Sequence, residues 1–182
     1  MLEREDALKL LADENFEPNL MQHALASEAV LEALARRFEL PEEEVKLWAM
    51  TGLLHDVDYP RTKDDPARHG LEAEAILTGK LPAEAVYAIK AHNGECTGVQ
   101  PESRFDFALR CGETVTGLIS AAALVRPNGL EGMEPKSLKK KMKDKAFAAS
   151  VNRETIRECE KIGLELDEFL RISIDAMRKM ES

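Results

Sequence analysis

The chain has 182 residues and a formal net charge of −9, because 34 Asp and Glu outnumber 25 Lys and Arg. This length fits one domain with a substantial hydrophobic core. Ala, Leu, Glu and Lys make up 83 of the 182 residues, which favours helix, and aromatic residues are only 5%. A sandwich, a barrel or a large sheet is therefore not expected. Bulk nucleic-acid binding by so acidic a surface is not expected either, although a local basic patch is allowed.

The first residues and the cysteines indicate a cytoplasmic protein. The chain begins with an acidic segment that has no apolar core like that of a signal peptide. No apolar run is expected to approach the roughly 18 residues that a membrane span needs. Cys96, Cys111 and Cys159 are odd in number and form no CxxC motif, so we expect no disulfide framework and a reducing compartment.

Hydrophobic spacing and helix-start signals predict an all-α chain. The first two helices are expected over residues 3–13 and 19–38, and a third begins at Pro41 and delivers the pair His55-Asp56. Residues 57–65 are predicted to form a loop. A fourth helix is expected to open at Asp65-Pro66, with Asp65 as its N-cap and His69 in its first turn.

The second half of the chain continues the helical pattern. Helices are predicted over residues 82–92 and 105–125, separated by a loop over residues 94–103. Residues 130–146 are short and basic, and their six lysines are expected to form a solvated helix face, with a polyanion contact or a lid over substrate phosphate as the alternative. One or two further helices are expected over residues 152–179, with a break near Gly163.

The histidines carry the strongest functional signal. All four lie within one 70-residue stretch, each near a helix end or a loop, and an acidic residue, Glu113, follows them. They are His23, His55, His69 and His92. A single histidine is usually a hydrogen-bonded structural residue, so the weight comes from the ordered set. Imidazole and carboxylate suit Fe, Mn, Zn, Ni or Co. Adjacent residues are about 100° apart on a helix, so His55 and Asp56 can share a metal only near a helix end.

These motifs together resemble the HD-domain superfamily of metal-dependent phosphohydrolases, in its subgroup of small single-domain HDIG-type proteins. The similarity covers about residues 20–178. The segments that carry it are Met21-Gln22-His23-Ala24, Gly52-Leu53-Leu54-His55-Asp56-Val57-Asp58-Tyr59, His69-Gly70-Leu71-Glu72-Ala73, Ala88-Ile89-Lys90-Ala91-His92-Asn93, Thr116-Gly117-Leu118-Ile119, Ala123-Leu124-Val125-Arg126-Pro127 and Asn152-Arg153-Glu154.

The resemblance implies an all-α HD domain whose helices converge on a central metal-binding cleft. It implies one domain over residues 1–182, with a core at about 20–126 and a C-terminal helical extension at about 130–180. First-metal ligands would be His23, His55, Asp56 and Glu113. His69 and His92 would bind a second metal or the substrate phosphate. The cofactor would be one or two divalent ions of Fe, Mn, Zn, Ni or Co, with Mg possible, and the substrate a small phosphate ester such as a nucleotide.

One position departs from the family pattern. The last ligand is usually Asp, often after two Ala, whereas this chain reads Cys111-Gly112-Glu113. Glu is one methylene longer, so its carboxylate must fold back or the helix must lie further away. Gly112 costs about 1 kcal/mol in a helix interior relative to Ala, and room for a displaced Glu113 would explain it. A weakened metal site, or a contact through water, is the alternative.

Several polar residues near the motif have open roles. Asp58 is expected to act as a general base or to orient a histidine, or only to cap a turn. Phosphate contacts are expected among Arg61, Lys63, Arg68, Lys90 and Asn93, with a solvated-surface role as the alternative for each.

Two functions follow from this reading. The first is a phosphomonoesterase or phosphodiesterase that uses metal-activated water. The second is a metal- or nucleotide-binding module in which Glu113 has weakened or abolished catalysis. The sequence indicates neither the substrate nor the oligomeric state.

Overall fold

The computed structural model describes residues 2–180, and this part of the chain contains helices and no strand. This confirms the predicted all-α class. The helices, in chain order, are α1 (Arg4–Asp13), α2 (Pro18–Arg37), α3 (Glu42–Leu54), α4 (Tyr59–Thr62), α5 (Ala73–Leu77), α6 (Ala83–His92), α7 (Gly94–Thr97), α8 (Arg104–Leu124), α9 (Pro135–Lys143), α10 (Arg153–Arg157), the 3₁₀ helix η1 (Glu158–Ile162) and α11 (Leu166–Met180).

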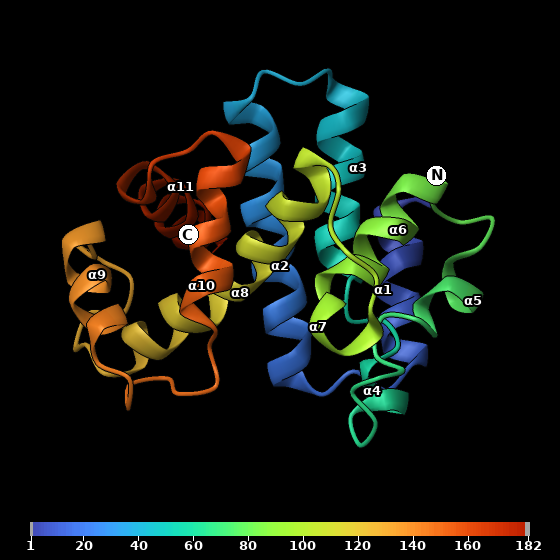
Figure 1. The fold of residues 1–182 in the computed structure, drawn as a ribbon, viewed down its shortest axis with the longest axis horizontal. Helices are drawn as coiled ribbons and strands as arrows, with labels where there is room; N and C mark the ends of the chain where they lie inside the picture. Colours follow the sequence, from blue (N-terminus) through green and yellow to red (C-terminus); the bar gives the residue numbers. More distant parts are fainter. Residues whose placement is uncertain (1, 181–182) are drawn as a thin grey trace.

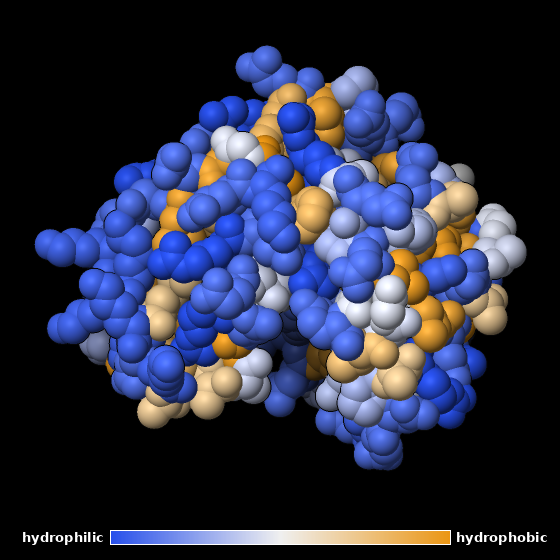
Figure 2. Space-filling view, viewed as in Figure 1, coloured by the Kyte–Doolittle hydropathy of each residue, from blue (hydrophilic) through white to orange (hydrophobic). Residues whose placement is uncertain are grey.

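Three long helices form the centre of the molecule. α2 packs against α3 and α8, and α6 also packs against α8. Figure 1 shows the C-terminal helices α9 to α11 on one flank of this centre and α1 and α4 to α7 on the opposite flank. The core is almost entirely aliphatic, with Leu31, Leu53 and Leu118 fully buried. The surface in Figure 2 is largely hydrophilic, and apolar residues occur on it in scattered groups.

Local sequence signals explain most helix boundaries. α2 has Pro18 in its first turn, where the missing N–H costs nothing. Three glutamates occupy the first turn of α3 and face the positive end of its dipole. α8 begins with a capping box, in which the Ser103 side chain accepts from Asp106 N and Asp106 accepts from Ser103 N. Gly163, with φ of +87°, ends η1 at the break that the sequence predicts.

The segment between α4 and α5 differs from the sequence prediction. Residues 64–72 form a series of turns, and the next helix begins at Ala73, so the helix expected from Asp65 is wrong. The physical reason is a buried carboxylate: Asp58 accepts hydrogen bonds from the backbone N–H of Gly70 (2.7 Å) and Ala73 (3.1 Å). Gly70 also has φ of +91°, which no helix contains. This segment therefore wraps around a side chain.

Two predicted loops contain short helices. The loop expected over residues 57–65 includes α4, and the loop expected over residues 94–103 includes α7. Each is a single turn of four residues, too short for periodicity to reveal.

α8 corrects the expectation that no segment is long and apolar enough to span a membrane. By length and composition alone it qualifies, although 56% of its most apolar window is buried inside the protein. It packs against α2, α6 and η1 and carries Arg110 and Glu113 within its length. The apolar character of α8 is therefore accounted for by the core of this fold.

Candidate metal centre

Five different parts of the fold bring the predicted ligands together. His23 lies on α2, the pair His55-Asp56 directly follows α3, His69 lies in the turns of residues 64–72, His92 is the last residue of α6, and Glu113 lies in the middle of α8. Their side chains form two groups whose ligand atoms lie within 4.8 Å of one another. We call His23, His55 and Glu113 the helical group, and Asp56, His69 and His92 the loop group.

The Asp56 carboxylate lies close to the histidines of both groups. One of its oxygens, Oδ1, lies 3.4 Å from His55 Nε2, 3.2 Å from His69 Nε2 and 3.6 Å from His92 Nε2. The other, Oδ2, lies 3.6 Å from His23 Nε2. All four imidazoles therefore point the same ring nitrogen at one carboxylate. The helix ends at Leu54, which is why two adjacent residues can face one point, as the sequence predicted.

The opposite ring nitrogen of two histidines is held by the backbone. His55 Nδ1 lies 2.8 Å from the carbonyl oxygen of Gly52, and His92 Nδ1 lies 2.5 Å from that of Ile89. A carbonyl oxygen only accepts, so Nδ1 donates in both rings. In the neutral imidazole, Nε2 then carries the lone pair that a metal needs.

His23 reaches the same state through a hydroxyl. Its Nδ1 lies 2.9 Å from Thr116 Oγ1, and that hydroxyl lies 2.7 Å from the carbonyl oxygen of Glu113. The single hydroxyl proton goes to the carbonyl, so Thr116 accepts from His23 Nδ1–H. His23 Nε2 is thereby left as an acceptor.

Asp58 is the residue that holds Nδ1 of His69. It is fully buried, and its Oδ1 lies 3.0 Å from His69 Nδ1 while its Oδ2 accepts the two backbone N–H groups of Gly70 and Ala73. The Asp58 carboxylate is thus occupied by the His69 ring and by the backbone of the segment that carries it. This geometry is the one in which a carboxylate orients a metal-binding histidine.

The Nε2 atoms of the histidines face one another in pairs, an arrangement that a bound cation would stabilise. His23 Nε2 and His55 Nε2 are 3.1 Å apart, as are His69 Nε2 and His92 Nε2. For His23 and His55, the two facing atoms are both lone-pair acceptors, so neither can satisfy the other. The donor set of four imidazoles and two carboxylates therefore fits one or two divalent transition-metal ions.

Burial and charge set the protonation of these groups. Burial lowers the pKa of His55 and of His92 to about 4, so both are neutral at pH 7. Burial also lowers the pKa of His69, but hydrogen bonds to Asp56 and Asp58 outweigh it and raise that pKa to about 10. Burial raises the pKa of Glu113 to about 8. Without metal, His69 and Glu113 therefore both hold a proton at pH 7.

Glu113 lies inside the helical group despite its extra methylene. Its Oε2 lies 3.8 Å from His23 Nε2, and its other oxygen accepts from the Thr114 hydroxyl. Gly112 has a different role from the one expected. A Cβ at Gly112 would lie 2.7 Å from Leu31 Cδ2, so this glycine lets α8 pack closely on α2. Close approach of the two helices, and not room for Glu113, is the reason for Gly112.

The expected phosphate contacts have protein partners. Arg61 pairs with Glu14, Arg68 pairs with Glu72, Lys90 Nζ lies 3.0 Å from Glu74 Oε2, and the Asn93 amide donates to the carbonyl oxygens of Pro66 (2.8 Å) and His69 (3.2 Å). The first three side chains are therefore neutralised locally, and Asn93 braces the backbone of a histidine. Within residues 2–180, Lys63 has no such carboxylate within ion-pair distance and lines a pocket beside Tyr59.

Comparison with known proteins identifies the family. The model of the HD domain matches residues 20–145, well over half of the chain, and the chain therefore belongs to the HD-domain family. HD-domain proteins are generally metal-dependent phosphohydrolases. The matched segment contains all four histidines, Asp56 and Glu113. Searches of curated proteins and of solved structures returned no match.

Proposed function

We propose that this protein is a metal-dependent phosphohydrolase that cleaves a nucleotide or a related phosphate ester. The observation that carries the proposal is the convergence of four Nε2 atoms on Asp56, all within 3.6 Å. Membership of the HD-domain family supports the reaction class. His23, His55, Asp56 and Glu113 would hold one metal, and His69 and His92, with Asp56, would hold a second metal or contact the phosphate.

A divalent ion in this centre would lower the pKa of a bound water and neutralise charge that develops on the phosphoryl group. The chain supplies the positions of the ligands. Thr116 and the carbonyl oxygens of Gly52 and Ile89 hold three imidazoles with Nε2 directed at Asp56. Asp58 holds the fourth, and its burial and three contacts support a positioning role over that of a general base.

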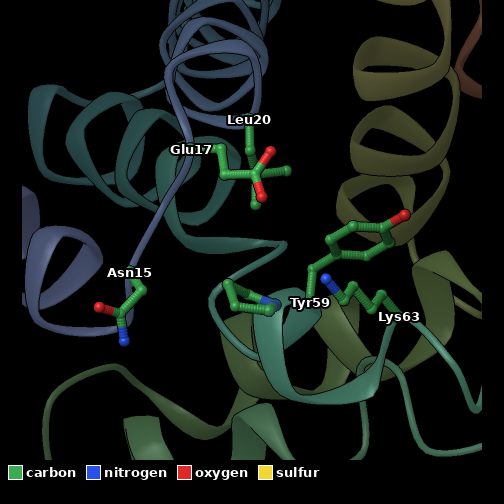
Figure 3. A pocket seen from close by; sticks show the side chains of 6 residues that line it. Asn15, Glu17, Leu20, Tyr59 and Lys63 are labelled. Carbon is green, nitrogen blue, oxygen red and sulfur yellow. The ribbon is translucent and has the colours of Figure 1, made fainter.

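A neighbouring pocket of about 400 Å³ supports a site for the organic part of the substrate. Figure 3 shows Tyr59 and Lys63 on one side of it and Glu17 and Leu20 on the other. Both walls adjoin the centre: Leu20 lies one helical turn before His23, and the Tyr59 ring meets the His69 ring edge-on at 5.3 Å between centroids.

The composition of this pocket suits a phosphate ester with a planar group. Tyr59, a residue that is 40% exposed, offers an aromatic ring on its side of the pocket, and Lys63 offers a cation. Exposed aromatic rings stack on bases, and cations contact phosphate. Of the cations expected to contact phosphate, Lys63 is the one retained in this proposal, since Arg61, Arg68 and Lys90 are paired with carboxylates.

Metal analysis and hydrolysis assays test the proposal. We expect the purified protein to retain a transition metal and to hydrolyse p-nitrophenyl phosphate, bis(p-nitrophenyl) phosphate or nucleoside monophosphates. His55→Ala should lose both metal and hydrolysis. Asp64→Ala, an exposed carboxylate in the same region, is the matched control and should keep both. Absence of transition metal from the wild type, together with unchanged hydrolysis in His55→Ala, would overturn the proposal.

The alternative is a binding module whose catalysis is weakened by Glu113. The variant Glu113→Asp separates the two functions. The position of Glu113 within the helical group supports an adapted ligand, so shortening it should lower metal affinity and turnover. A large gain in turnover would instead favour the binding module.

A further inference from the structure

Arg110 is a buried cation outside the ligand set. It lies on α8, its side chain is 3% exposed, and its guanidinium lies between the end of α6 and η1. All three of its side-chain nitrogens donate hydrogen bonds. A buried arginine persists only where its charge and its N–H groups are matched, so these partners define its role.

The first partners are the last carbonyls of α6. Arg110 Nη1 donates to the carbonyl oxygens of Ala91 (3.1 Å) and His92 (3.0 Å). The final carbonyls of a helix have no partner within the helix, and a cation is favourable at that end of the dipole. Because α6 ends at His92, these bonds hold the backbone of a proposed ligand.

The second partners are two carboxylates. Nε donates to Glu158 Oε2 at 2.7 Å, and Nη2 donates to Glu95 Oε1 at 2.6 Å and to Glu158 Oε1 at 3.3 Å. The Glu158 side chain is only 14% exposed, whereas that of Glu95 is 60% exposed. Only the planar fork of arginine makes this many directed contacts, and the ammonium of lysine does not.

The position of Arg110 on α8 connects the two ligand groups. Glu113 lies three residues later, one helical turn away, and belongs to the helical group. Arg110 therefore ties the helix that carries Glu113 to the backbone of His92, which belongs to the loop group. Glu158 extends the link to η1, beyond the residues 20–145 that match the family.

We propose that Arg110 is a positioning residue that sets His92 against the metal centre, and that Glu158 makes the metal affinity of the HD domain depend on the C-terminal helices. The inference rests on the proposed function, because it needs a metal at the centre. Arg110 would act through the backbone of His92 and not through contact with substrate.

Metal affinity measured on folded protein tests the inference. Mn²⁺ and Co²⁺ dissociation constants would be measured by competition with a chromophoric chelator, below the unfolding temperature of each variant. We expect Arg110→Met to raise the dissociation constant by about 10- to 100-fold, the range seen when a group that orients a ligand is removed. Arg110→Lys should give an intermediate rise, and Glu158→Gln a smaller one.

Arg178→Lys is the matched control. Arg178 also donates to backbone carbonyls, those of Leu130 and Met133, and also pairs with a carboxylate, that of Asp175, but it contacts no ligand. It should lower the unfolding temperature and leave the dissociation constants unchanged. If Arg110→Met behaves like Arg178→Lys, Arg110 is only structural and the inference is wrong.

A double mutant adds a readout that a general loss of stability would not move. If Arg110 acts through His92, Arg110→Met should weaken metal binding less than twofold in a His92→Ala background. An equal loss in both backgrounds overturns the inference. Wild-type protein that binds neither ion overturns the proposed function and the inference together. Metal binding that depends on Arg110, without hydrolysis of any phosphate ester, overturns the proposed function alone.

Discussion

The two ligand groups are held in place by different means. His23, His55 and Glu113 project from or directly follow α2, α3 and α8, whose mutual packing forms the core. His69 lies in an irregular segment, and its orientation depends on a single carboxylate, Asp58, with three contacts. The helical group is thus positioned by apolar packing spread over many residues, and the loop group by a few buried polar contacts.

The two groups are therefore sensitive to different kinds of substitution. Packing distributes the cost of a substitution over many contacts, whereas a buried polar network is strongly affected when one member is removed. Asp56 belongs to the loop group but also lies 3.6 Å from His23 Nε2 and 3.4 Å from His55 Nε2 of the helical group. Substitutions at Asp56, in the loop group and in the helical group should therefore have distinguishable effects.

Removal of Asp56 should have the largest effect, because its carboxylate lies close to the histidines of both groups. Asp56→Ala and the better-matched Asp56→Asn should lose all measurable metal and hydrolysis, since four Nε2 atoms would lose their shared carboxylate. Metal content by mass spectrometry and folding by circular dichroism check this, with Asp64→Asn as the control. Full metal content in Asp56→Asn would show that the imidazoles suffice.

Asp58→Asn should affect the loop group alone. Its amide must either direct an N–H at His69 Nδ1 or oppose the N–H groups of Gly70 and Ala73, so the ring loses its orientation. We expect metal affinity to fall by about 10- to 100-fold. Chelator competition measures this. A loss of kcat at unchanged metal content would instead identify Asp58 as a general base.

Metal binding should depend on pH because the ion displaces one proton from each group, that of Glu113 and that of His69. Without metal, Glu113 has a pKa of about 8 and His69 of about 10, so each holds a proton at pH 7 that an ion must displace. Affinity should therefore rise with pH, by roughly tenfold per pH unit for each proton released, and the slope should fall above pH 8 once Glu113 is ionised. Titrations in buffers of different ionisation enthalpy count the protons. Affinity that is constant from pH 7 to pH 9 would contradict this.

Gly112→Ala should have the smallest effect and act on the helical group. The added methyl would lie 2.7 Å from Leu31 Cδ2, and overpacking of about 1–3 kcal/mol exceeds the gain of about 1 kcal/mol in helix propensity. We expect the free energy of unfolding to fall by about 1 kcal/mol. Gly117→Ala on the same helix is the control.

At Gly117 the nearest side-chain atom, Val151 Cγ2, is 3.2 Å from the added methyl, and Val151 is only partly buried. Its side chain can move, so Gly117→Ala should leave the free energy of unfolding unchanged or slightly higher. Urea unfolding of both variants measures the difference. An equal loss in both would show that close packing of α8 on α2 is not what Gly112 provides.

The long helices and the identity of the histidine set could be predicted from local sequence patterns. Periodicity, Pro at helix starts and Gly163 at a helix end are local signals, so α2, α3, α6 and α8 lie within one or two residues of their predicted bounds. The order of the histidines and the His55-Asp56 pair sufficed for the family. These features could be predicted because each depends on residues near one another in the chain.

The surroundings of the proposed ligands, in contrast, depend on contacts that form only in the folded chain. The course of residues 64–72 is set by a carboxylate at Asp58, up to fifteen residues away, against a local pattern that favoured helix. The close packing at Gly112, the hydrogen bonds of Arg110, and the pairing of Arg61 and Lys90 depend on side chains that come together only after the helices pack. Such contacts join residues distant in sequence, and no local propensity encodes them.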